Sequence, residues 1–248
     1  MGTVFSIDVR DADVGEQAID EVVQWLHWVD STFSTYQADS EISRLARDDI
    51  TLRECDPQVG KILDLCDELG WATSGYFSAR AAGVLDPSGL VKGWAIEQAS
   101  ELLRSAGSVN HYVNGGGDVQ CAGEFAPGQP WRVGVAHPLE PGQLAGVVAG
   151  NDLAVATSGT AERGQHIVDP HTRRPPTALA AVTVTGRHLT YVDAYATAAF
   201  AMGDGARSWL EGLPGYSAFG VTADGATWRT GGFVEMSATL SPSAKSLR

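Results

Sequence analysis

Apolar residues recur along the first third of the chain with two different periods. Residues 4–9 mostly alternate apolar and polar side chains, which predicts a β-strand. From Gly15 to Phe33, and again after Asp56-Pro57, apolar residues return every three or four positions, which predicts two amphipathic helices. Asp56 is a typical helix cap, and Pro57 suits the first turn of the helix that follows it. Ser40 is a typical cap for a short helix that begins at Glu41. The chain therefore starts as a strand followed by helices.

The stretch from Asp86 to Asp118 predicts a turn, a helix and a strand that ends in three glycines. Asp86-Pro87-Ser88-Gly89 has the composition of a turn, because proline fixes φ and glycine tolerates positive φ. The helix expected after Lys92 leads into a strand and then Asn114-Gly115-Gly116-Gly117-Asp118, where residues without Cβ let another group approach the backbone. Backbone amides, a lysine and a helix start are typical of an anion site, for example one for a diphosphate. Taken alone, the pattern favours an ordinary solvated turn, since it matches no nucleotide-binding fingerprint.

Short β-type runs separated by glycine and proline turns fill the second half of the chain. Such a meander predicts a mainly antiparallel sheet. The expected strands cover residues 119–122, 131–136, 144–149, 153–157, 181–185, 216–221 and 226–229, and the expected helices cover 193–202 and 206–213. We therefore predict an α+β fold over residues 1–236: a single domain of two packed lobes, with a mainly antiparallel sheet flanked by helices. The serine-rich residues 237–248 predict a disordered tail.

Composition narrows the classes of protein that this chain can represent. With 44% hydrophobic and 19% charged residues it is globular, and its net charge of -13 argues against a nucleic-acid partner, which needs clustered Lys and Arg. Three scattered cysteines form neither a disulfide framework nor a zinc motif. We expect no membrane-spanning segment and a cytoplasmic location, or an exported or lipid-anchored one if a signal segment was trimmed ahead of Met1.

Asp193 and Thr197 stand four positions apart on a predicted helix, so their oxygens project from one face. This spacing suits two ligands of a hard cation such as Mg²⁺, with open positions left for phosphate oxygens. The alternative is that Asp193 caps the helix and Thr197 is packed. Small side chains around the pair weaken that alternative, because they would let a ligand approach: Ala194, Ala196, Ala198 and Ala199.

The segment His166-Ile167-Val168-Asp169-Pro170 places an imidazole near a carboxylate in a turn that proline stiffens. Such a histidine can act as an acid or a base near neutral pH. It can equally be a structural residue that makes hydrogen bonds, and the residues alone leave both interpretations open.

Several segments, in this order, resemble the ApbE family of FAD:protein FMN transferases, whose older name refers to thiamine biosynthesis. They are Met1-Gly2-Thr3, Ser34-Thr35-Tyr36, Asp39 to Leu45, Gly75-Tyr76-Phe77, Asp86 to Ala95, Asn114 to Asp118, Ala156 to Gly159, His166 to Pro170 and Asp193 to Gly203. The chain departs from the family pattern at Ser78, where an aspartate is common, and at Ala161, where a tyrosine is common.

The resemblance implies an enzyme that binds FAD with Mg²⁺ and transfers the FMN half to a Thr or Ser hydroxyl of an acceptor flavoprotein, releasing AMP. By position, His166 would serve transfer as the base, although an aspartate near the metal is an alternative. The implied metal ligands are Asp193, Thr197 and the carbonyls of Gly89 and Ala196. The implied nucleotide contacts are Met1, Tyr36, Tyr76, Phe77, Ser78, Asp86, Lys92 and Ile167. Two other functions stay open: an FAD pyrophosphatase giving FMN and AMP, and a non-catalytic FAD-binding protein.

Overall fold

The computed structural model describes residues 2–161, 164 and 166–233 of the 248-residue chain. Met1, predicted to contact the nucleotide, and the tail predicted at residues 237–248 lie outside the described residues, so both stay predictions. Within the described ranges, no helix combines the length and the apolar character needed to cross a membrane.

Helices dominate the N-terminal part of the chain. The elements are β1 (Phe5–Val9), α1 (Glu16–Phe33), α2 (Glu41–Ala46), the short 3₁₀ helix η1 (Leu52–Glu54), α3 (Pro57–Ala72) and α4 (Ser88–Ser105). The expected caps are confirmed, because the Ser40 side chain accepts a hydrogen bond from the Ser43 N–H and the Asp56 side chain accepts one from the Gln58 N–H. Local sequence signals therefore set the starts of α2 and α3.

Strands make up most of the chain after α4. The elements are β2 (His111–Gly115), β3 (Asp118–Ala122), β4 (Trp131–Ala136), β5 (Leu144–Gly150), β6 (Ala154–Gly159), β7 (Leu179–Gly186), α5 (Leu189–Met202), η2 (Gly203–Gly205), α6 (Ala206–Glu211), β8 (Ser217–Thr222) and β9 (Thr227–Arg229). Seven strands form one sheet in the order β1-β2-β3-β6-β7-β8-β9, and β4 pairs with β5 in a separate ribbon. All the pairings of these named strands are antiparallel, which confirms the predicted α+β class.

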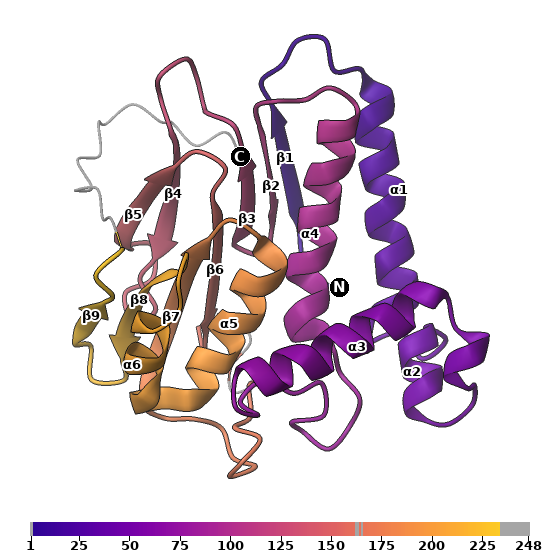
Figure 1. Ribbon diagram of the computed structural model, residues 1–248, viewed down its shortest axis with the longest axis vertical. Coiled ribbons are helices and arrows are strands. Elements are labelled where there is room, and N and C mark those ends of the chain that lie inside the picture. The colour runs from indigo at the N-terminus through magenta and orange to yellow at the C-terminus, as the bar shows by residue number, and fades with distance from the viewer. Residues whose placement is uncertain (1, 162–163, 165, 234–248) are drawn as a thin grey trace.

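The helices and the ribbon pack on opposite faces of the seven-stranded sheet. α4 lies against β2 and β3, α5 lies against β6 and β7, and α1 packs on α4 (Figure 1). On β8, Ala218 belongs to the core under the helices, whereas Phe219 and Val221 pack with ribbon residues. Because successive side chains of a strand point to opposite faces, the ribbon covers the face away from the helices.

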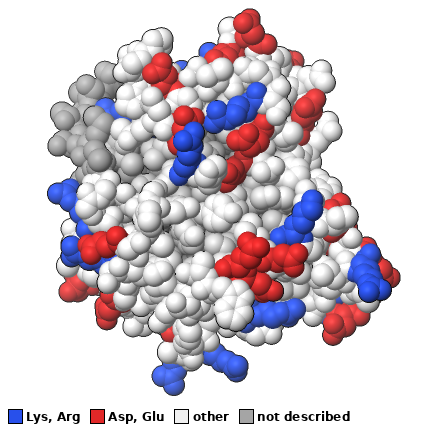
Figure 2. All heavy atoms as spheres, in the orientation of Figure 1, with Lys and Arg blue, Asp and Glu red and all other residues white. Residues whose placement is uncertain are grey.

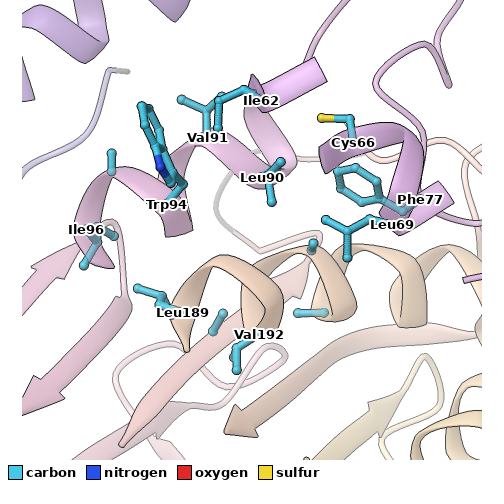
Figure 3. Close-up of a cluster of buried hydrophobic side chains, with 14 of the residues drawn as sticks. Ile62, Cys66, Leu69, Phe77, Leu90, Val91, Trp94, Ile96, Leu189 and Val192 are labelled. Carbon is cyan, nitrogen blue, oxygen red and sulfur yellow. The ribbon is translucent and has the colours of Figure 1, made fainter. Parts of the chain in front are cut away.

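The main hydrophobic core joins α3, α4 and α5. Figure 3 shows Cys66, Leu69 and Phe77 together at one end of this cluster, with Leu90 of α4 nearby and Leu189 and Val192 of α5 along its other side. Leu69 is 2% exposed and Leu90 is completely buried, so the start of α4 is anchored in the core. Packing of this kind fixes the backbone of α4 relative to α5.

Two helix starts differ from the prediction. α4 begins at Ser88 rather than after Lys92, so Gly89 is helical and does not occupy the positive-φ turn position predicted for it. The Asp86 carboxylate accepts a hydrogen bond from the Ser88 N–H and so supports the earlier start.

α5 begins at Leu189, four residues before the predicted start, which places Asp193 inside the helix. The alternative in which Asp193 caps the helix is therefore wrong. The first N–H groups of α5 bond to side chains from other elements: Leu189 N–H donates to Gln120 and Thr190 N–H donates to Glu97. Sequence near the helix start could not reveal partners this distant.

Gly93 allows α4 and α5 to approach closely. A Cβ at this position would lie 2.6 Å from the Leu189 carbonyl oxygen and 2.7 Å from the Asp193 Cβ. Atoms of a side chain cannot occupy that space without a shift of backbone, so only glycine fits between the two helices.

We predict that Gly93→Ala lowers the free energy of unfolding by about 1 to 3 kcal/mol, because the extra methyl group separates the helices. The matched control is Gly60→Ala on α3, where an added Cβ meets nothing within 4 Å. This control should stabilise the protein by roughly 0.5 to 1 kcal/mol through helix propensity. Urea unfolding of the three proteins checks the prediction, and equal effects of the two substitutions would contradict it.

A buried histidine lies at the other end of α4. His111 is completely buried, with Nε2 2.8 Å from the Ser100 Oγ and Nδ1 2.9 Å from the Ser108 Oγ. Burial lowers the pKa of His111 to about 4, and the nearby Arg104 adds to this effect. The imidazole is therefore neutral at physiological pH and joins the end of α4 to β2.

We predict that the free energy of unfolding falls by roughly 2 to 3 kcal/mol as the pH drops from 6.5 to 4, because the unfolded chain protonates His111 first. A folded pKa below the unfolded value gives a contribution that is complete above about pH 6.5 and is lost on acidification. His111→Gln should make the pH dependence in this window shallower, because glutamine does not titrate there. If the free energy of unfolding has the same pH dependence in wild type and His111→Gln, the lowered pKa of His111 does not contribute to stability.

Candidate functional site

A cavity of about 300 Å³ lies where the first turn of α4, the middle of α5 and several loops meet. Most of the predicted site residues line this cavity: Tyr36, Tyr76, Phe77, Ser78, Asp86, Gly89, Lys92, His166, Ile167, Asp193 and Thr197. Ala196 is fully buried on α5 and is not among the lining residues. The structure therefore brings together side chains that the sequence separates by more than a hundred positions.

Two buried carboxylates and one ammonium group form the polar centre of the cavity. Lys92 Nζ lies 2.6 Å from Asp118 Oδ2 and 3.7 Å from Asp193 Oδ1. The carboxylates are held from the other side by backbone amides, since Gly93 N–H donates to Asp193 Oδ2 over 2.9 Å and Thr157 N–H donates to Asp118 Oδ1 over 3.1 Å. Asp193 and Asp118 are 3% and 1% exposed, so their charges need these partners.

No role was predicted for Asp118 from the sequence. It follows the glycine-rich turn between β2 and β3, in which Gly116 and Gly117 have φ values of 59° and 88°. These left-handed conformations let the chain reverse direction within two residues, which places Asp118 next to Lys92. An acidic residue directly after a glycine turn is the only local signal that could have pointed to it.

The electrostatics of this centre favour an additional cation. Burial raises the pKa of the Asp193 carboxyl; the Lys92 ammonium opposes this shift, and the Asp118 carboxylate adds to it. When both carboxyl groups are ionised, two carboxylates beside one ammonium leave one negative charge unbalanced. A cation that binds hard oxygen ligands would offset that charge.

The oxygen atoms around Asp193 fit a hard cation such as Mg²⁺. The Thr197 hydroxyl projects one turn further along α5 and lies 3.4 Å from the Ser158 hydroxyl on β6. Within the described ranges no cluster of three or more His, Cys, Asp or Glu side chains could hold a metal ion. A cation here would therefore need hydroxyl, carbonyl and phosphate oxygens as further ligands, as Mg²⁺ in nucleotide sites does.

Gly89 lies directly against Thr197. A Cβ at Gly89 would come within 3.3 Å of the Thr197 Oγ1 and 3.4 Å of the Phe77 ring. The first turn of α4 thus approaches α5 at a second point, close to the proposed metal ligands. The carbonyl groups of Gly89 and Ala196 stay predicted ligands.

The aromatic residues of the cavity differ in exposure. Tyr36 is 82% exposed at the rim and offers an open ring face to a ligand. Phe77 is 3% exposed and belongs to the hydrophobic core, so it supports the wall rather than presenting a free face. Tyr76 is partly buried and packs edge-to-face on His171 with ring centroids 4.5 Å apart.

His166 and Ile167 form a second wall, distant in sequence from Tyr76 but part of the same cavity. His166 is exposed, and its Nδ1 lies 3.2 Å from the Gly164 carbonyl oxygen. Asp169, expected near the imidazole, has its carboxylate bonded within its own turn, where it accepts from the His171 N–H and the Thr172 hydroxyl. Burial raises the pKa of Asp169, but these hydrogen bonds together lower it by more than burial raises it. The pKa of Asp169 therefore lies below its ordinary value.

Surface charge is mixed on one face of the molecule. On the face shown in Figure 2, the described Lys and Arg side chains lie beside Asp and Glu rather than in one continuous basic patch. This agrees with the net charge of -13, in which acidic residues outnumber Lys and Arg.

Comparison with known proteins identifies the family to which this chain belongs. The sequence model of the ApbE family matches residues 1–85 and 78–219. The fold resembles that of the flavin transferase ApbE from Vibrio cholerae, with a TM-score of 0.80, 22% identity and coverage of 93% of this chain and 94% of that one. It also resembles the ApbE protein from Thermotoga maritima, with a TM-score of 0.82, 22% identity and the same coverage. This chain belongs to the ApbE family.

Curated relatives are similar over about half of the chain. An FAD:protein FMN transferase of Vibrio cholerae serotype O1 is 31% identical over 130 residues, which is 48% of this chain and 39% of that protein. An FAD:protein FMN transferase of Rhodobacter capsulatus is 34% identical over 135 residues, which is 51% of this chain and 26% of that protein. The matches thus span less than half of the length of these relatives.

We predict that Lys92→Met lowers the free energy of unfolding by on the order of 3 kcal/mol, because it leaves two buried carboxylates without their cation. Adding Asp118→Asn to this variant should restore much of the loss, since it removes one of the unpaired charges. Lys61→Met, on the exposed surface of α3, is the matched control and should change stability by less than about 0.5 kcal/mol. Chemical denaturation measures all four proteins. If Lys92→Met is as stable as the control, Lys92 does not hold the carboxylates.

Proposed function

We propose that this protein transfers the FMN moiety of FAD to a Thr or Ser hydroxyl of an acceptor flavoprotein and releases AMP. The observation that carries the proposal is the cavity in which Lys92, Asp193 and Thr197 meet the Tyr76 and His166 walls. Membership of the ApbE family supports it, as do the curated relatives named FAD:protein FMN transferase.

The reaction exchanges one phosphorus–oxygen bond for another. The acceptor hydroxyl oxygen attacks the phosphorus of the FMN half, the phosphoanhydride bond breaks, and AMP leaves with the bonding electron pair. The product is a phosphodiester that joins FMN to the Thr or Ser side chain. Such transfers depend mainly on positioning and on neutralising the charge of the phosphate oxygens.

Each group of the cavity has a role in this proposal. Asp193 and Thr197, with the carbonyls of Gly89 and Ala196, would hold Mg²⁺, which would supply positive charge to the diphosphate. Lys92 is a second cation for the same oxygens, and Asp118 fixes its position through the 2.6 Å ion pair. Tyr36, Tyr76, Ser78, Asp86 and Ile167 would contact the nucleotide, and Phe77 would support the wall behind them. Met1 is an expected contact outside the described residues.

His166 is proposed as the base that accepts the proton of the acceptor hydroxyl. Its side chain is exposed and lines the cavity, so an incoming hydroxyl can reach it directly or through a water molecule. An imidazole is suited to this task because its pKa lies near neutrality in water.

Incubation with FAD, Mg²⁺ and an acceptor flavoprotein domain tests the proposal. We predict a fluorescent flavin band that stays with the acceptor in a denaturing gel, together with one AMP per flavin attached, and loss of both on chelation of Mg²⁺. His166→Ala should lower the rate by about 10² to 10⁴, the usual contribution of a general base. His27→Ala, at an exposed position of α1, should have the wild-type rate.

The products separate this function from its two alternatives. Release of AMP with free FMN would identify an FAD pyrophosphatase, and retention of intact FAD would identify a binding protein; either result would contradict transfer. A wild-type rate for His166→Ala would remove that residue from the mechanism without affecting the assignment of the reaction.

A further inference from the structure

The cavity has two walls that come from distant parts of the chain. One wall is formed by residues 76–78, after α3, and the other by residues 166–168, between β6 and β7. Both must keep a fixed separation if one nucleotide is to contact them together. The segment that follows the second wall contacts the first through His171, which is not itself among the lining residues.

His171 contacts the loop that carries Tyr76 in three ways. Its Nε2 lies 3.1 Å from the Ser74 carbonyl oxygen, 97 positions earlier in the chain, and must be the donor because a carbonyl only accepts. Its ring packs edge-to-face on Tyr76 with centroids 4.5 Å apart and an angle of 65°. A Cβ at Gly75 would come within 3.2 Å of the His171 Cε1, so the imidazole also packs on the Gly75 backbone.

The turn that carries His171 is held by its own hydrogen bonds. Asp169 and Arg174 form a bridge in which the Asp169 N–H donates to the Arg174 carbonyl. The Asp169 carboxylate accepts from the His171 N–H over 2.9 Å and from the Thr172 hydroxyl over 2.8 Å. The side chain of His171 therefore projects from a turn with few ways to move.

The opposite loop is equally constrained. Ser74 and Gly75 have φ values of 54° and 84°, which turn the chain sharply after α3 and aim the Ser74 carbonyl at His171. The Thr73 hydroxyl donates to the Leu69 carbonyl and accepts from the Phe77 N–H, so the loop is tied to the end of α3. A rigid turn thus meets a rigid loop through one imidazole.

We propose that His171 is a positioning residue that fixes the Tyr76 wall relative to the His166 wall, so that FAD finds both walls in place. The inference rests on the proposed function, since it concerns how the same cavity binds FAD. His171 acts through Tyr76 and through the segment that leads back to His166. Without it, part of the energy of FAD binding would be spent on ordering the two walls.

The dissociation constant for FAD, measured by titration calorimetry, tests the proposal. His171→Ala should weaken FAD binding by about five- to tenfold. The substitution removes one hydrogen bond and one aromatic contact, and only part of their free energy contributes to FAD binding. His171→Gln keeps an N–H donor and His171→Phe keeps the ring, so each should lose less than His171→Ala. His27→Ala is the matched histidine control on exposed α1 and should bind as wild type does.

A double-mutant cycle with Tyr76→Ala shows whether His171 acts through Tyr76. In the Tyr76→Ala protein, adding His171→Ala should weaken FAD binding much less than it does in wild type, because the two residues share one contact. We also expect the KM for FAD to rise more than kcat falls, which loss of general stability would not produce. Fully additive effects, or an unchanged dissociation constant for His171→Ala, would overturn the proposal.

Hydrogen exchange gives a readout that does not depend on FAD or on transfer. Amides of residues 73–78 should exchange faster in His171→Ala than in wild type, while those of α1 should not change. Unchanged exchange in residues 73–78 would also overturn the proposal. If wild type binds FAD but transfers no FMN, the proposed function fails, and affinity and exchange still decide the role of His171.

Discussion

The arrangement of this protein depends on one buried carboxylate. Asp193 lies inside α5 and accepts a hydrogen bond from the Gly93 N–H of α4, while Lys92 of the same helix approaches its other oxygen. An ionised carboxylate that is 3% exposed is costly unless such partners surround it. The absence of a side chain at Gly93 makes the approach possible, so steric fit and charge compensation act at the same place.

Lys92 and Asp193, which lie at this contact, also line the cavity. The two helices that carry Lys92 and Asp193 are anchored in the core shared with α3, so the polar centre stands on rigid elements. Around that centre the cavity is completed by loops: the glycine turn before Asp118, the Tyr76 loop and the His166 segment. A rigid polar centre with loop-borne walls suits a reaction that relies on charge neutralisation and on the position of two substrates.

Local pattern was sufficient for much of the fold and insufficient for contacts between distant segments. The amphipathic period of α1 and α3, the Ser40 and Asp56 caps and the antiparallel meander could all be read from the sequence, because each depends on neighbouring residues. The start of α5 could not be predicted from the sequence, because its first N–H groups donate to the distant Gln120 and Glu97 side chains. Asp118 and His171 were missed for the same reason: their partners, Lys92 and Ser74, lie far away in the sequence. The resemblance to the ApbE family supplied what pattern alone could not, a reason to consider Asp193, Thr197 and His166 together.

In the proposed function, the oxygens around Asp193 and Thr197 hold a divalent cation against the diphosphate of FAD. A crystal structure of the protein soaked with FAD and Mn²⁺, used as a substitute for Mg²⁺ with strong anomalous scattering, tests it most directly. We expect an anomalous peak in contact with the Asp193 carboxylate and the Thr197 hydroxyl, with diphosphate oxygens bound to the same ion and near Lys92. A diphosphate bound elsewhere, or no peak at Asp193 when FAD occupies the cavity, would contradict it.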